Sequence, residues 1–517
     1  MGINAQKDIR KGKRAYIGLE DSEKKWKPII LFQAMLIFLN MNAFASAFTF
    51  IPDREKGALW DVWVFHANDT YYLFYDFIPP GRGITAFAVA TSKDGVHWKD
   101  RGPTVHKPDY ARGIGSGFTW KSPTFEKDGK YQCNMSLRKD GLPTIVIAES
   151  TDLFNWKIRD NVYYRPDARW YDSKKGRWDC ISSVLRPGGG YYGYCTATAK
   201  DGDIWCIGFG ETLDGVHWKS LAPPDIAWGK WKKFDAMCVE LGGAEFINGK
   251  YYLMINLSHA KGGGSHMLTF SSDKPEGPFV LAKKNPEVVY GDVHFSRFGR
   301  SPSEILVVQH YLTQETGDGG AGWRKNWDTA YMAPLKEAIV DQEGILRLGY
   351  WKGNESLKGK EVPVETPSLQ NTFMLLNHSF NVNKGFVLEG TVKLPQEGEQ
   401  QLPGIYLESG EEHPTVIQAT AKGTSRIGTV RKDGSDFQLR KSKIVWCGPA
   451  EVDREMTFGP TVKFRLLVRK SMMEFYMDDI LFHIRALKYP PTGKVGIVGT
   501  TGSICDLKAW DMSFDEK

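Results

Sequence analysis

Three acidic residues stand ten to twelve positions before an aromatic turn phrase that recurs along the chain: Asp61, Asp179 and Glu240. Hydrolysis of a glycosidic bond needs one carboxyl group that stays protonated to release the leaving oxygen, and a second, ionised carboxylate that attacks the sugar or activates water. Crowded carboxylates raise one another's pKa, so one of them can remain an acid near neutral pH. Each acid alone is typical of a turn cap or an ion pair. Three in register favour glycoside hydrolysis, provided that the fold brings them to one pocket.

The recurring phrase fixes the architecture that must position these acids. Tyrosines stand sixty residues apart at positions 71, 131, 191 and 251, and most are preceded by a Gly- or Asn-containing turn sequence. A second phrase of the type Ser-Lys-Asp-Gly-Val-His-Trp follows some twenty residues later, at 92–98, 150–156 and 212–218. Such a period indicates a repeated unit that buries its apolar face only against its neighbours. Short aromatic and β-branched runs between turns predict that the unit is a small antiparallel sheet, as in a β-propeller.

The period predicts an all-β chain that begins with a five-bladed β-propeller and ends with a β-sandwich. The propeller is expected over residues 54–345, with blades at 54–105, 113–160, 176–222, 235–283 and 288–340. Beyond about residue 365 the period is lost while alternating β patterns continue, which predicts a β-sandwich domain at 365–517. The first strand of each propeller blade lines the central channel. The three acids would therefore converge on one axial pocket.

Five further residues are predicted to bind substrate. Three tryptophans are close in sequence to the acids or to the equivalent point of the second blade, and aromatic faces stack well on sugar rings, although core packing is the alternative for each. Glu245 is a rival to Glu240, but it is expected nearer the outer end of the same strand. The five predicted binding residues are Trp60, Trp63, Trp120, Arg177 and Asp292.

Several of these phrases resemble glycoside hydrolase family 32, the group of invertases, inulinases and levanases. The stretch 71–79, Tyr-Tyr-Leu-Phe-Tyr-Asp-Phe-Ile-Pro, resembles that family's opening blade, and 88–98 resembles its blade-closing phrase. Four later motifs follow in the family's order, and residues 464–482 resemble its β-sandwich, so that the resemblance covers most of 55–515. The family has Ser-Gly-Ser, Arg-Asp-Pro, Glu-Cys-Pro and Gly-x-Asp-x-Tyr where this chain has Gly115-Ser116-Gly117, Arg177-Trp178-Asp179, Val239-Glu240-Leu241 and Tyr290-Gly291-Asp292.

The resemblance implies a role for each acid. Asp61 would be the nucleophile, Asp179 the transition-state stabiliser and Glu240 the acid/base of a retaining enzyme that removes terminal fructofuranosyl units. The chain departs from the family where Asn-Asp-Pro-Asn-Gly is replaced by Trp60-Asp61-Val62-Trp63, so the asparagines of the fructose pocket are missing. Two alternatives stay open: an inverting arabinofuranosidase or xylosidase similar to family 43, in which Asp61 would activate water, and a carbohydrate-binding propeller without catalysis.

The N-terminus and the composition set the remaining expectations. Residues 1–47 combine a basic stretch, the apolar run 29–39 and Ala45-Ser46-Ala47, which predicts a cleaved signal peptide and a secreted or periplasmic protein with no membrane span after cleavage. This segment holds eight basic and four acidic residues, and so four of the six net positive charges, which leaves no nucleic-acid-binding footprint in the rest of the chain. Seven cysteines without metal-ligand spacing predict neither a zinc site nor a disulfide framework. We expect an oligo- or polysaccharide partner and no cofactor; the sequence does not predict the oligomeric state.

Overall fold

A computed structural model describes most of the chain after residue 47, and residues 47–517 form one compact unit. The architecture is all-β, with only short helical segments: α2 (Phe125–Asp128), η2 (Gly229–Lys233) and η4 (Lys352–Leu357). The predicted signal peptide lies outside the described residues. These are 48–53, 55–159, 161–259, 265–289, 293–312, 330–365, 373–395, 402–409, 414–420, 422–439, 451–487 and 491–514.

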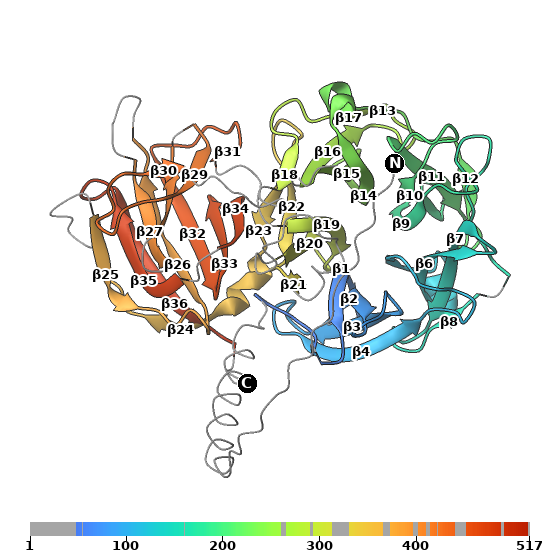
Figure 1. Cartoon of the computed structure of the whole chain (residues 1–517), viewed down its shortest axis with the longest axis horizontal. Coiled ribbons are helices and arrows are strands. Elements are labelled where there is room, and N and C mark those ends of the chain that lie inside the picture. The colour runs from blue at the N-terminus through green and yellow to red at the C-terminus, as the bar shows by residue number, and fades with distance from the viewer. Residues whose placement is uncertain are drawn as a thin grey trace, which may run out of the picture. The chain divides into compact units, whose positions relative to one another are not determined.

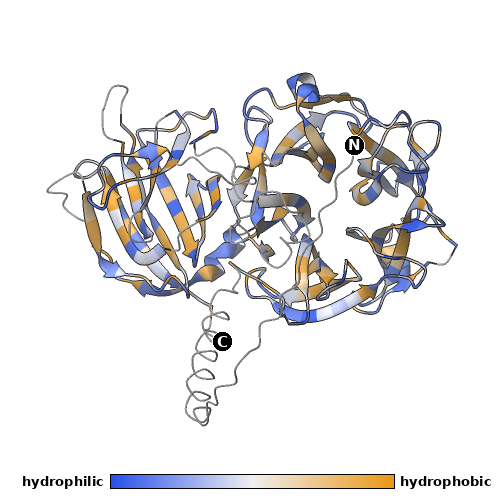
Figure 2. Ribbon diagram, in the orientation of Figure 1, coloured by the Kyte–Doolittle hydropathy of each residue, from blue (hydrophilic) through white to orange (hydrophobic). Residues whose placement is uncertain are grey.

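Four separate sheets lie around a common centre in Figure 1, as expected of propeller blades. In the first three, the strands follow one another in chain order. Their strands are β1 (Ala58–Ala67), β2 (Thr70–Ile78), β3 (Ala86–Ser92) and β4 (Lys99–His106); β5 (Thr119–Lys121), β6 (Tyr131–Lys139), β7 (Leu142–Ser150) and β8 (Lys157–Ile158); and β9 (Trp178–Leu185), β10 (Tyr191–Ala197), β11 (Cys206–Thr212) and β12 (Lys219–Leu221). The fourth contains β13 (Ile226–Ala227), β14 (Ala236–Ile247), β15 (Lys250–His259), β16 (Ser265–Ser272), β17 (Phe279–Leu281) and β18 (Glu287–Val289). Hydrophobic residues concentrate on the strands, and hydrophilic residues dominate many of the connecting loops (Figure 2).

The repeated Ser/Thr-x-Asp phrase is a capped turn at the end of the third strand of a blade. In the first copy, Gly95 donates its backbone N–H to Ser92 Oγ at 2.9 Å, and His97 donates its backbone N–H to Asp94 Oδ1 at 2.9 Å. The third copy repeats both bonds through Thr212 and Asp214. Burial acts to raise the pKa of Asp94, but the hydrogen bonds it accepts lower that pKa to about 2. The phrase recurs because a short polar side chain can replace backbone partners at a tight turn.

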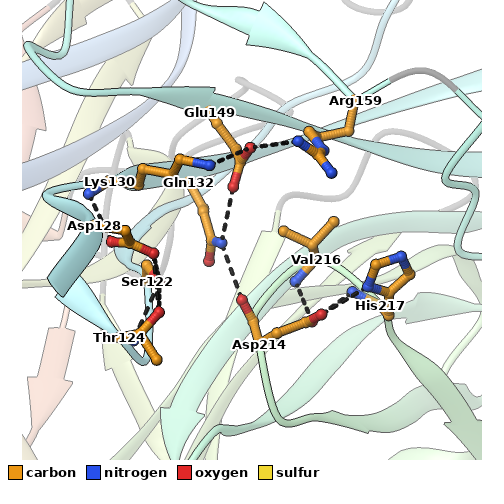
Figure 3. A network of polar contacts seen from close by, with 10 residues as sticks. All are labelled: Ser122, Thr124, Asp128, Lys130, Gln132, Glu149, Arg159, Asp214, Val216 and His217. Atoms are coloured by element: carbon orange, nitrogen blue, oxygen red, sulfur yellow. Dashed lines mark hydrogen bonds and ion pairs between the residues drawn. The ribbon is translucent and has the colours of Figure 1, made fainter.

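The third copy of this turn also joins the second sheet to the third (Figure 3). Gln132, which is buried in β6, donates its Nε2 to the Asp214 carbonyl at 3.0 Å and accepts a hydrogen bond from Trp120 Nε1 at 2.9 Å. On the other side of Gln132, Glu149 is held by Lys130 and Arg159 at 3.3 and 3.2 Å. The sixty-residue repeat therefore sets contacts between sheets as well as within them.

The prediction of a five-bladed propeller is confirmed only in part, because the described residues form four blade sheets and the strands at the fifth position belong to a larger sheet. The strands at the fifth position are β19 (Val293–Arg300), β20 (Ile305–Leu312), β21 (Ala330–Met332), β22 (Lys336–Val340) and β23 (Leu346–Tyr350). β19 contacts both β1 and β14, so these strands occupy the place between the first and fourth sheets. Their sheet does not end at β23: Gly349 pairs with Ile480 of β34 (Ile480–Ala486), and an eleven-stranded sheet results. This pairing covers an edge that would otherwise expose unpaired backbone groups.

The C-terminal part consists of two sheets that share one hydrophobic core. The eleven-stranded sheet continues through β34 into β33 (Met472–Met477), β32 (Thr461–Arg469), β26 (Phe386–Lys393), β36 (Ile504–Met512) and β24 (Lys358–Val362). The facing sheet contains β25 (Phe373–Ser379), β35 (Pro491–Val498), β27 (Gly404–Ser409), β28 (Thr415–Ala419), β29 (Thr424–Thr429), β30 (Gln438–Leu439) and β31 (Glu451–Asp453). This two-layer arrangement is the one expected of a β-sandwich.

Buried polar groups connect the C-terminal sheets to the blades. Lys336 of β22 pairs with Glu474 of β33, and both side chains are fully buried. Arg454 donates to the carbonyls of Leu481, at 2.7 Å, and of Glu287, at 2.9 Å. Since a buried charge is tolerated only when it is paired, these contacts fix the two parts to each other.

The described part of the chain contains neither a membrane-spanning helix nor a cluster of metal ligands. Within it, no helix has the length and apolar character needed to cross a membrane. In the same residues no group of three or more His, Cys, Asp or Glu side chains is arranged to hold a metal ion. All six cysteines within the described residues are free thiols.

Candidate active site

The three predicted acids all lie on the innermost strands of their sheets. Asp61 belongs to β1, Asp179 to β9 and Glu240 to β14. Asp61 stands at a β-bulge: Trp60 and Val62 pair with successive residues of β2, and Asp61 is the extra residue, with a φ of 26°. A bulge of this kind turns a side chain away from the regular alternation of the strand. The backbone of β1 is therefore shaped around Asp61.

The Asp61 carboxylate is held by two donors from other sheets. Ser116 Oγ, from the second sheet's approach, hydrogen-bonds to Asp61 Oδ2, and Arg297 Nη2 of β19 donates to the same oxygen at 2.9 Å. Arg297 also donates to the Gly117 carbonyl at 3.1 Å. The Arg297 side chain is only 3% exposed and that of Asp61 is 18% exposed, so the pair is shielded from water while Asp61 remains accessible.

A second carboxyl group, Asp76, lies behind Asp61 on β2. It is completely buried, and its Oδ2 lies 3.0 Å from Ser116 Oγ, the same hydroxyl that contacts Asp61. Burial and the nearby Asp61 carboxylate raise the pKa of Asp76 well above its ordinary value, although Arg297 and Ser116 oppose this.

Counting protons gives the direction of this chain of hydrogen bonds. A serine hydroxyl carries one proton, so Ser116 can donate to only one of the two carboxyl groups that it contacts. If Asp76 carries a proton, it donates to Ser116 Oγ, and Ser116 donates onward to Asp61, whose Oδ2 also accepts from Arg297. This arrangement satisfies every contact, and it agrees with the raised pKa of Asp76.

Arg177 links the other two acids. Its Nη2 donates to Asp179 Oδ2 at 2.9 Å and its Nη1 donates to Glu240 Oε1 at 2.6 Å. The side chains of Arg177, Asp179 and Glu240 are 40%, 25% and 22% exposed, so all three remain open to a ligand. The other oxygen of Asp179, Oδ1, is buried and has no hydrogen-bond partner among the described residues. Glycine is required at the neighbouring position 115, because a Cβ there would lie 2.9 Å from this oxygen.

A cavity of about 830 Å³ opens beside Asp179. Its wall comes from the segment before β5, from the β6–β7 hairpin and from the approach to β9, and it includes Arg177 and Asp179. The volume is within the range of sites that hold a small ligand. Asp179 and Arg177 therefore border a space that could take a sugar.

Not all of the predicted binding residues are where the sequence suggested. The prediction that Trp63 and Trp120 stack on sugar is wrong: Trp63 is 1% exposed and packs between Phe74 and Phe87, and Trp120 is 3% exposed and packs on Trp218. Both indoles fill the space between sheets, which is the larger gain for a large apolar ring.

The remaining predicted residues divide differently. Trp60 is also buried, with its ring centroid 5.1 Å from that of His310. Arg177 reaches two acids, as described above, and Asp292 lies outside the described residues. Glu245, the rival to Glu240, is buried further along β14 and pairs with Arg300.

Sequence reasoning missed the supporting residues Asp76, Ser116 and Arg297. The hairpin itself held a signal for Asp76, since the turn at 68–69 pairs Ala67 with Thr70, and counting back places positions 61 and 76 opposite each other. Ser116 lies in the segment just before β5 of the second sheet, at the position where the other sheets have an acid. Arg297 had no comparable signal, because the turn phrase is lost in its part of the chain.

No protein-family model and no curated protein sequence matches the chain. Solved structures do match its fold. A sucrose-6-phosphate hydrolase from Lactobacillus gasseri aligns over 95% of this chain and 98% of its own, with 16% identity and a TM-score of 0.67. An exo-inulinase from Aspergillus awamori aligns over 90% and 98%, with 14% identity and a TM-score of 0.64. A fructan 1-exohydrolase IIa from Cichorium intybus aligns over 91% and 97%, with 13% identity and a TM-score of 0.62.

These similarities extend along nearly the whole chain, so they include both the blades and the C-terminal sheets. A further match is a family 32 β-fructofuranosidase from Bombyx mori, at 13% identity and a TM-score of 0.63. The resemblance to family 32 is thus confirmed at the level of the fold.

Proposed function

We propose that the chain is an exported glycoside hydrolase that removes terminal furanosyl units, of the fructofuranosyl type, from oligo- or polysaccharides. One observation carries the proposal: Asp61, Asp179 and Glu240 come from three different sheets, each is held by an arginine, and Asp179 with its arginine lines an open cavity. Similar folds include enzymes named as fructan and inulin hydrolases, which supports the choice of sugar. In this proposal β19, β20, β22 and β23 act as the fifth blade, and the C-terminal sheets act as the β-sandwich.

Asp61 is proposed as the nucleophile. Arg297 and Ser116 both donate to one of its oxygens, which fixes the orientation of the carboxylate and leaves the other oxygen for the anomeric carbon. An ionised carboxylate held in one orientation is the requirement for a covalent glycosyl-enzyme intermediate. This favours retention over the inverting alternative, because a base that activates water needs no such restraint on one oxygen.

Glu240 is proposed as the acid/base, and Asp179 as the carboxylate that binds sugar hydroxyls. Arg177 bridges the two, with Nη2 on Asp179 and Nη1 on Glu240. In this proposal Glu240 takes a proton from solvent, gives it to the leaving oxygen, and later removes a proton from the attacking water. Asp179, whose side chain is partly exposed, accepts a hydrogen bond from a sugar hydroxyl.

The test is hydrolysis of aryl furanosides and of fructans, arabinans and xylans by the mature protein and by two variants. Asp61→Asn and Glu240→Gln should each lower kcat by about a thousandfold or more, since each removes a group that acts on the reacting bond. Both variants should still bind the sugar. Activity that survives both changes would refute the proposal, and release of arabinose or xylose with inverted anomeric configuration by proton NMR would replace it with the family 43 type of reaction.

Export is a separate part of the proposal, since it depends on residues 1–47 alone. N-terminal sequencing of protein recovered from the periplasm or medium should give a mature chain that starts near position 48. A protein that keeps its N-terminus and stays inside the cell would refute this part without affecting the reaction.

A further inference from the structure

The cavity beside Asp179 has more positive than negative side chains in its wall. Four cationic side chains line it and only two acids do, one of which is Asp179 itself. The lining charges are Arg112, Arg138, Lys139 and Arg177 against Asp140 and Asp179. Arg177 is used by the acids of the reaction, so the charges that matter here are the other three cations and Asp140.

Those three cations are poorly neutralised. Arg112 is exposed and makes no hydrogen bond or ion pair with any residue that the structure describes. Arg138 donates only to backbone carbonyls, those of Gly141 and Lys174 among them, at 2.9 and 3.1 Å. These bonds hold the β6–β7 hairpin in place but leave the positive charge of Arg138 uncompensated.

Lys139 and Asp140 form the one weak pair of this wall. The Lys139 Nζ lies 3.6 Å from Asp140 Oδ1 and 4.2 Å from the ring centroid of Tyr110. Asp140 is 71% exposed, and Arg165 approaches its other oxygen at 4.0 Å. An exposed carboxylate shared by two cations neutralises little of the charge within the cavity.

We propose that the substrate carries an anionic group, a carboxylate, sulfate or phosphate ester, on the part of the glycan that extends from the three acids into this cavity. The proposal rests on the proposed function, because it places the cleaved bond at Asp61 and Glu240. Concave walls of one sign concentrate the field and attract a ligand of opposite charge. Guanidinium groups bind planar or tetrahedral oxyanions with two parallel hydrogen bonds, and Arg112 has its donors available for this.

The experiment compares one pool of fructo-oligosaccharides in four forms: untreated, oxidised at primary hydroxyls to carboxylates, sulfated and phosphorylated. The mature protein should hydrolyse at least one anionic form with a kcat/KM about tenfold or more above the neutral form. That preference should decline as NaCl is raised from 20 to 500 mM, because salt screens attraction between exposed charges. The form that gains most identifies the anion.

Variants locate the effect. Arg112→Gln combined with Lys139→Gln should remove the preference and leave kcat/KM for the untreated pool within about twofold. Lys174→Gln is the matched control, because this exposed lysine is close in the fold but is not part of the cavity wall. Equal rates on neutral and anionic forms, or a preference that the double variant keeps, would overturn the inference while the proposed function stands. Binding of an anionic form that depends on Arg112 and Lys139, without hydrolysis of any form, would overturn the proposed function instead.

Discussion

Replacement of Ser116 by alanine tests the hydrogen-bonded chain behind the proposed nucleophile. Ser116 Oγ is the contact between Asp76 and Asp61, and its hydroxyl is one of two donors to Asp61 Oδ2. A hydrogen bond to a charged group contributes about 1.5–3 kcal/mol. If the bond holds Asp61 in the orientation needed for attack, its loss lowers kcat by roughly 10- to 150-fold, because about 1.4 kcal/mol corresponds to a factor of ten.

The fraction of folded protein distinguishes this effect from a general loss of structure. In Ser116→Ala the Asp61 carboxylate keeps Arg297 but loses its second donor, so kcat should fall while the protein stays folded at the assay temperature. Ser116→Thr restores the hydroxyl and should restore the rate. Asp76→Asn is the matched control: its amide can donate to Ser116 as the protonated carboxyl does, so it should keep activity within a few-fold of the wild type.

The assay is hydrolysis of a chromogenic aryl furanoside between pH 3 and pH 8, with thermal unfolding measured on the same samples. Two results would refute the reasoning. A Ser116→Ala enzyme with unchanged kcat would show that the hydroxyl does not act on Asp61. An Asp76→Asn enzyme as inactive as Asp61→Asn would show that Asp76 is needed as a carboxylate.

Three further predictions concern stability. Burial raises the pKa of Asp76, so its own contribution to the free energy of unfolding should be full below the unfolded-state pKa near 4 and should be lost as pH rises. Asp76→Asn removes this loss, and urea titrations should show the stability of the variant relative to the wild type growing from pH 4 to pH 7. Lys336→Met removes the cation paired with the buried Glu474 and should lower the free energy of unfolding by about 3–5 kcal/mol. Adding Glu474→Leu should recover much of this stability. A double variant as unstable as the single one would contradict the pairing. Asp214→Ala removes the acceptor for two backbone N–H groups and should lower the free energy of unfolding by about 1 kcal/mol, by analogy with helix caps. Asp214→Asn should lower it less. Equal losses of stability in chemical denaturation would argue against the cap.

The repeat made much of the fold predictable. Turn phrases report local hydrogen bonds, and these bonds are the same in each copy: a hydroxyl accepts from one backbone N–H and an aspartate accepts from the next two. Strand order and blade limits follow from such local signals. The joining of β23 to β34 did not follow from them, because Gly349 and Ile480 are 131 residues apart and nothing local marks the pairing.

The candidate site was predictable only where it follows the repeat. Asp61, Asp179 and Glu240 stand at corresponding points, and reading back from each turn finds them. Trp63 stands two residues after Asp61, so regular alternation along the strand would place both side chains on the same side. The bulge at Asp61 breaks that alternation, because one extra residue changes which side chains face the centre, and Trp63 is buried.

The charges around the acids explain why a shared architecture does not by itself assign a site. The blades place three carboxyl groups in register, yet their chemistry depends on residues that break the repeat. Arg297 comes from the strand set without a turn phrase, and Asp76 comes from a second strand rather than a first. Together with Ser116 they give Asp61 a buried cation on one side and, behind the hydroxyl, a buried carboxyl group whose pKa is raised. Arg177, by contrast, is partly exposed and contacts both Asp179 and Glu240. The site therefore has one acid held by a buried arginine and two that share a partly exposed one, and the proposed double displacement likewise assigns different tasks to Asp61 and Glu240.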